Sequence, residues 1–133
     1  MKLSTPKRFQ VFEFHLMPIA KPRMTQRDKW AKRPAVMRYR AFADELRFQA
    51  SGQSFSLENG LAYEFHLAMP SSWSKKKRLE KLGKLHDQKP DIDNLIKSVF
   101  DSLLEQDCVI GHIGQVKKVW AIAPKIIITK RIN

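Results

Sequence analysis

The chain is 133 residues long, which suits a single domain built around one hydrophobic core. Its 25 Lys and Arg residues outweigh 13 Asp and Glu residues and give a formal net charge of +12, which favours nucleic acid over a small metabolite as the partner. The single cysteine excludes an internal disulfide framework and a multi-cysteine zinc site, and no apolar run reaches the ~18 residues of a membrane span, so we expect a cytoplasmic protein that does not engage a membrane.

Alternating apolar side chains predict two strands in the first half of the chain. The first covers 9–16 and ends at Pro18. The second covers 61–69, has the clearest alternation in the sequence, and follows the turn signal Asn59-Gly60. Both are expected to lie in one sheet.

The segment between these strands is strongly basic at its start. Residues 21–40 contain eight Lys and Arg residues and one acid, Asp28, with prolines interspersed, so we expect an extended or loop-rich segment. A moderately amphipathic helix is then predicted over 39–50, ending before Gly52 and packing on the sheet.

The second half predicts two helices followed by two strands. A short basic helix is expected over 75–80, with serines ahead of it as candidate N-caps, and a strongly amphipathic helix over 92–104. The β-rich segments 109–122 and 125–132 are expected to form a terminal hairpin. The whole chain, 1–133, is thus predicted to be one α+β domain with a mixed β-sheet and packed helices.

Acidic residues gather in one part of this basic chain. Six of the 13 acids fall between Asp87 and Asp107. Pro90 favours an extended approach to Asp91, after which the chain turns into the helix near Asp93. Carboxylates are the ligands that hard cations such as Mg²⁺ prefer, and a basic surface would bring phosphate to them, so the pattern indicates a metal-dependent nuclease.

A purely structural interpretation of the same residues stays open. Asp91 would cap the helix, Asp93 would favour the helix dipole, and Lys97 would form salt bridges with Asp93 and Asp101 at helical spacing. Asn94 is a poor helix former directly after two aspartates, and together with the basic surroundings it favours the metal site.

At these residues the chain resembles the RusA family of Holliday junction resolvases, endodeoxyribonucleases common in prophages. The shared pattern is Asp-x-Asp-Asn-Leu, a Lys four residues after the second Asp, and a further Asp. Here it is Asp91-Ile92-Asp93-Asn94-Leu95 with Lys97 and Asp101. The similarity extends upstream through 86–90 and to the early segments 21–25 and 32–34.

The resemblance implies which residues hold metal and cleave. Two aspartates and a third acid after the helix would bind Mg²⁺, with Mn²⁺ as an alternative, and the lysine would assist cleavage. The residues that take these roles here are Asp91, Asp93, Asp107 and Lys97. Asp101 and Glu105 remain alternatives for the third acid, and His112 stands where related sequences can have another acid.

The resemblance also implies a homodimer that nicks two opposed strands of a four-way junction, leaves 5′-phosphate and 3′-hydroxyl ends, and uses no small-molecule cofactor. Phosphate contacts with branched DNA are expected from basic residues on three segments. These are Lys21, Arg23, Arg27, Lys29, Lys32, Arg33, Lys75, Lys76 and Lys89. Two rivals stay open: a non-catalytic architectural DNA- or RNA-binding protein, and a resolvase relative with weakened metal binding.

Overall fold

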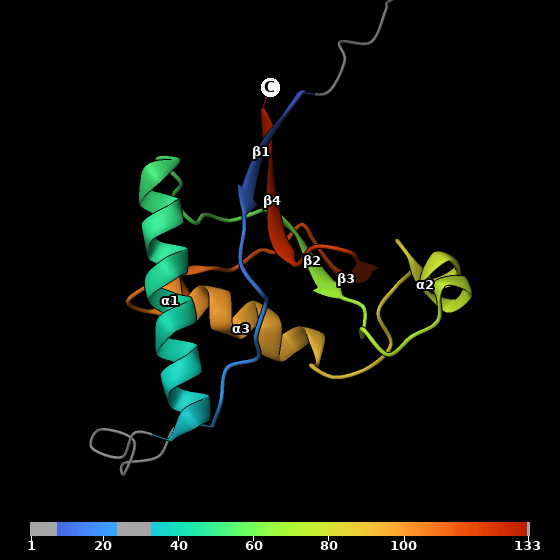
Figure 1. Ribbon diagram of the computed structural model, residues 1–133. Helices are drawn as coiled ribbons and strands as arrows, with labels where there is room; N and C mark the ends of the chain where they lie inside the picture. The colour runs from blue at the N-terminus through green and yellow to red at the C-terminus, as the bar shows by residue number, and fades with distance from the viewer. Residues whose placement is uncertain (1–7, 24–32, 133) are drawn as a thin grey trace, which may run out of the picture.

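A mixed sheet of four strands forms the centre of the computed structural model, which describes residues 8–23 and 33–132 (Figure 1). The strands are β1 (Arg8–Phe14), β2 (Ala62–Ala68), β3 (Gln115–Ala121) and β4 (Lys125–Ile132). Their spatial order is β1-β4-β2-β3, with β4 antiparallel to both β1 and β2, and β2 parallel to β3. The predicted α+β fold with a mixed sheet is confirmed, as are the two strands of the first half.

The predicted terminal hairpin is wrong, because β2 lies between β3 and β4. Tyr63 of β2 is paired with Val116 of β3 on one side and with Ile128 of β4 on the other. Direct pairing of β3 with β4 would leave one edge of the most apolar strand without backbone partners. Residues 109–114 are also not a strand. The backbone N–H groups of Gly111 and His112 donate hydrogen bonds to the side-chain oxygen of Asn59, at 2.7 and 3.0 Å.

Two helices, α1 (Pro34–Gly52) and α3 (Ile92–Leu103), supply apolar side chains to the core on one face of the sheet (Figure 1). Leu46 of α1 and Leu95 of α3 are fully buried there beside Phe65 of β2. The start of α1 corrects an expectation, because 34–40 is helical and not extended. Pro34 occupies the first turn, where the missing N–H of proline is not needed.

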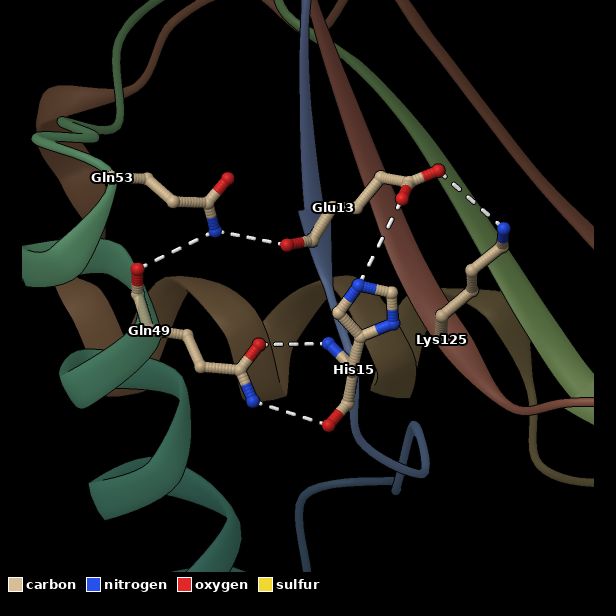
Figure 2. Close-up of polar contacts among 5 residues, drawn as sticks. All are labelled: Glu13, His15, Gln49, Gln53 and Lys125. Carbon is tan, nitrogen blue, oxygen red and sulfur yellow. Dashed lines mark hydrogen bonds and ion pairs between the residues drawn. The ribbon is translucent and has the colours of Figure 1, made fainter.

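The outer edge of β1 is covered at its end by two glutamines of α1 (Figure 2). The Gln49 side chain accepts a hydrogen bond from the His15 backbone N–H at 2.7 Å and donates one to its carbonyl at 3.1 Å. Gln53 donates to the Glu13 carbonyl at 2.8 Å. These amides replace the backbone partners that an edge strand lacks, so α1 is fixed against the sheet.

The third helix, α2 (Lys75–Lys81), lies beside β3 and apart from α1 and α3 (Figure 1). The Ser74 hydroxyl accepts a hydrogen bond from the Lys77 backbone N–H at 3.2 Å, which confirms the predicted basic helix and a serine cap. None of the helices in the described part of the chain is long and apolar enough to span a bilayer.

Candidate metal and phosphate site

Two exposed carboxylates stand at the start of α3. Asp91 occupies the N-cap position with extended backbone angles, yet its side chain makes no capping hydrogen bond. Within the described residues, neither Asp91 nor Asp93 has a hydrogen bond or an ion pair from its carboxylate to another side chain. No described residue therefore occupies either group in place of an external ligand, and a capping role for the Asp91 side chain is not observed.

The loop before Asp91 is held by a lysine that the sequence did not single out. The Lys118 ammonium in β3 donates a hydrogen bond to the Pro90 carbonyl at 2.7 Å and another to the Gln88 carbonyl. On the other side of Asp91, the buried side chains of Leu95 and Val99 fix α3 on the sheet. The two carboxylates thus lie between a tethered loop and a packed helix. Lys118 lies far along the chain and in no motif, so no sequence signal pointed to it.

A chain of ion pairs runs along one side of α3. The Lys97 ammonium lies 3.3 Å from Asp107 and 3.5 Å from Asp101. Asp101 also accepts a hydrogen bond from Lys21 at 2.6 Å, and its side chain is only 17% exposed. The salt bridge between Lys97 and Asp101 expected from helical spacing is present. The ion pair of Asp101 with Lys21 links the segment of Lys21 to α3. A second contact between them is the hydrogen bond that the Lys21 backbone N–H donates to the Asn94 carbonyl at 3.3 Å.

The two aspartates that flank Lys97 keep it charged. The carboxylate of Asp101, and then that of Asp107, raise the pKa of the Lys97 ammonium above its usual value. At neutral pH Lys97 is a fixed positive charge, so it suits the stabilisation of an anion and not the removal of a proton from water.

A basic surface pocket adjoins these residues. Its volume is about 460 Å³, and it is lined by Lys21, Pro22, Arg23, Asn94 and Lys97. Asn94 directly follows Asp93, so the pocket and the carboxylate share the first turn of α3. Three cations around one hollow attract a phosphate group, and the neighbouring carboxylates attract a cation.

The other predicted DNA contacts divide into two groups. Four are exposed lysines and arginines outside this pocket, namely Arg33, Lys75, Lys76 and Lys89. Arg33 donates a hydrogen bond to the Arg23 carbonyl at 2.9 Å, which links the start of α1 to the pocket. Arg27, Lys29 and Lys32 lie outside the described residues.

The three predicted metal ligands are not gathered into one cluster. In residues 8–23 and 33–132, no three His, Cys, Asp or Glu side chains lie together in a way that could hold a metal ion. Asp107 lies against Lys97, and the His112 carbonyl accepts a hydrogen bond from the backbone N–H of Gly60, two residues before β2. Asp91 and Asp93 still suit Mg²⁺, which proteins commonly hold through one or two carboxylates together with waters and substrate phosphates.

The chain also matches a known family. Comparison with curated proteins finds no match. The family model of endodeoxyribonuclease RusA matches residues 13–129, which include both exposed aspartates, Lys97, Asp107 and the tethering Lys118. The resemblance seen in the sequence is therefore confirmed, and the chain belongs to the RusA family of endodeoxyribonucleases.

Proposed function

We propose that this endodeoxyribonuclease resolves Holliday junctions by paired, symmetric, Mg²⁺-dependent nicks in DNA recombination and repair. The observation that carries the proposal is the pair of carboxylates, Asp91 and Asp93, without side-chain partners among the described residues and beside the pocket lined by Lys21, Arg23 and Lys97. Unpaired carboxylates within a chain of net charge +12 favour a cation, and the adjacent lysines and arginine favour the phosphate that shares it.

Asp91 and Asp93 would hold the metal, with Mn²⁺ as an alternative to Mg²⁺, and Asp107 would become the third ligand. Mg²⁺ at these carboxylates supplies charge neutralisation and activation of water. Binding of a phosphate to Lys97 competes with its ion pair to Asp107, so substrate entry would release that carboxylate. In the reaction, water attacks phosphorus and the bond to the 3′ oxygen breaks, which leaves a 5′-phosphate and a 3′-hydroxyl.

The charged Lys97 would stabilise the negative charge that develops on the phosphate. Because Asp101 and then Asp107 raise its pKa, it enters the reaction protonated. Oriented positive charge at a developing anion is commonly the largest single contribution to such catalysis.

A homodimer would supply the two sites that paired nicks require. One chain presents one pair of exposed carboxylates at the start of α3. Two opposed strands of a junction cannot both be cut at this pair at the same time, whereas a two-fold dimer presents the same site twice. Mass measurement in solution, with and without junction DNA, tests this part of the proposal.

The central experiment is cleavage of a synthetic four-way junction and a linear duplex, with Mg²⁺ or with EDTA. Symmetric nicks in the junction alone, dependent on metal, are expected from the wild type. Asp91→Asn should abolish cleavage and leave or strengthen binding, since it removes a negative charge that no contact among the described residues uses.

Asp87→Asn is the matched control, because it makes the same change at an exposed acid in the same loop and should still cleave. Tight binding without cleavage under every metal tried would support the architectural DNA-binding protein instead.

A further inference from the structure

An exposed arm stands next to the candidate site. We define the α2 arm as residues 73–86, which comprise α2 and the segment that returns to β3. None of the residues of α2, all of which the structure describes, is buried. The arm nevertheless carries three large apolar side chains in solvent, with Leu79 75% exposed, Leu82 43% and Leu85 70%. A helix without a buried face is not shaped by the core of its own domain.

The charge of the arm is almost entirely positive. Its single acid is Glu80, against six basic residues that surround the leucines in sequence. These are Lys75, Lys76, Lys77, Arg78, Lys81 and Lys84. The combination of phosphate-binding side chains with exposed leucines distinguishes the arm from an ordinary solvated helix.

Aromatic packing anchors the arm to β3. The ring of Trp120 in β3 lies 4.7 Å from that of Trp73 and 3.9 Å from that of His86, measured between centroids. The Lys77 ammonium lies 4.4 Å from the centre of the Trp73 ring. Both ends of the arm are therefore held on the same strand residue, and α2 is presented between them.

Backbone hydrogen bonds connect the arm to the loop of the candidate site. The Gly83 N–H donates to the Trp120 carbonyl, the Trp120 N–H donates to the Lys84 carbonyl, and the His86 N–H donates to the Lys118 carbonyl, each at 2.9 Å. The chain then passes through the loop that Lys118 tethers and reaches Asp91. The arm is thus held at a defined position relative to the carboxylates.

The chemistry of the arm fits branched DNA better than a plain duplex. Lysines on the arm can contact phosphates in either case. On an unbroken duplex an inserted leucine would first have to unstack neighbouring base pairs, which costs free energy. At a branch point stacking is interrupted, and an inserted leucine can cover an exposed base face, as apolar wedges do in DNA-bending proteins.

We propose that the α2 arm is a branch-point wedge, in which Leu79 and Leu85 cover unstacked bases while the surrounding basic residues hold the flanking phosphates. The wedge would give the enzyme its preference for branched over linear DNA. This inference rests on the proposed function, and its partner is the same DNA that the carboxylates cleave.

The test separates shape recognition from charge. Affinities for a four-way junction and for a linear duplex are measured in EDTA across a salt series. The Leu79→Ala/Leu85→Ala double variant should bind the junction about tenfold more weakly and leave duplex affinity and the salt slope unchanged. The Lys75→Gln/Lys76→Gln control should weaken binding to both DNAs and reduce the salt slope by about one for each phosphate that is no longer neutralised.

A base analogue such as 2-aminopurine at the branch point gives a second readout. Its fluorescence should change on binding of the wild type and not on binding of the leucine variant. Equal loss of junction and duplex affinity, or no loss of either, would overturn the wedge. So would leucine variants that keep junction preference but lose binding to vesicles containing phosphatidylserine, since the arm would then be a membrane contact.

The outcome is independent of whether the protein cleaves. If the wild type nicks junctions in an Asp91-dependent way and the leucine variant binds and nicks them equally well, the wedge fails and the resolvase stands. If the wild type shows the leucine-dependent preference without cleavage under any metal, the wedge stands and the proposed function fails.

Discussion

The Lys118 ammonium lies 2.7 Å from the carbonyl oxygen of Pro90, the residue that precedes Asp91. Lys118 belongs to β3, so a side chain of the central sheet holds the backbone from which the first carboxylate projects. It also donates to the Gln88 carbonyl, and its own carbonyl accepts from the His86 N–H at 2.9 Å. One strand residue therefore joins the sheet, the α2 arm and the loop of the candidate site.

Lys118→Met should slow cleavage more than it weakens DNA binding. The substitution leaves two carbonyl groups without their donor, which should cost about 1–3 kcal/mol of unfolding free energy. Looser placement of Asp91 should lower kcat by about ten- to a hundredfold with a smaller change in KM. The measurements are single-turnover cleavage and denaturant unfolding.

Lys117→Met is the control for this prediction. It removes the same charge from the adjacent strand position, where the partner of Lys117 among the described residues is Glu64, in a surface ion pair at 3.5 Å worth about 0–1 kcal/mol. Lys118→Arg should restore part of kcat, because it keeps a donor at the loop. Equal loss of kcat in the Lys117 and Lys118 variants would show that charge alone matters.

Lys97 should contribute no ionisation to the pH dependence of cleavage between about pH 6 and 9, a range that lies below the usual lysine pKa of about 10.4. Asp101 and then Asp107 raise its folded pKa, so their interaction with Lys97 is fully present below the unfolded pKa. That stabilisation is lost only as pH rises through the raised folded value, in the alkaline range. Lys97→Met should therefore lower cleavage by a constant factor across this range. A wild-type ionisation near neutral pH that disappears in Lys97→Met would instead identify Lys97 as a general base.

Acid should destabilise the loop through His86. Burial, and then the charge of Lys118, lower the pKa of this imidazole, whose Nδ1 accepts a hydrogen bond from the Gln88 N–H at 3.3 Å. A lowered folded pKa means that the stabilisation is present above the unfolded pKa and is lost as pH falls through the folded value. The unfolding free energy of the wild type should thus decrease from about pH 7 to pH 5, the range around the usual histidine pKa.

Comparison of two histidine variants isolates this effect. His86→Gln should flatten the acidic decrease, and His15→Gln, at an exposed position, is the matched histidine-to-glutamine control. An identical pH dependence in the wild type and in His86→Gln would exclude His86 as the source.

Local sequence patterns predicted the elements well and the connections less well. The alternation in 61–69 and the apolar face of 92–104 each reflect burial of one side of one element, so β2 and α3 appear close to their predicted bounds. The insertion of β2 between β3 and β4 depends on partners distant in sequence. Adjacency of β3 and β4 along the chain favoured a hairpin, and no local signal opposed it.

In the candidate site, too, the sequence predicted the local features and not the contacts between distant segments. The motif identified Asp91 and Asp93 because their spacing is local, and the structure finds both exposed at the start of α3. The tether from Lys118 and the ion pair between Lys21 and Asp101 join residues from separate elements. Such contacts have no periodic pattern, so they become visible only when the sheet is assembled.

The identity of the third acid can be tested by comparing Asp101→Asn with Asp107→Asn. Asp101 is largely buried in its pair with Lys21, so its loss should cost about 1–3 kcal/mol of unfolding free energy, whereas the more exposed Asp107 should cost about 0–1 kcal/mol. If Asp107 is the metal ligand, Asp107→Asn should abolish cleavage in a fully stable protein, and Asp101→Asn should still cleave when folded. The measurements are metal-dependent junction cleavage and denaturant unfolding.

The reverse pattern, with cleavage kept in Asp107→Asn and lost in folded Asp101→Asn, would assign the role to Asp101. Both acids contact the same ammonium of Lys97, so a loss of cleavage common to both variants and reproduced by Lys97→Met would instead reflect the placement of that lysine.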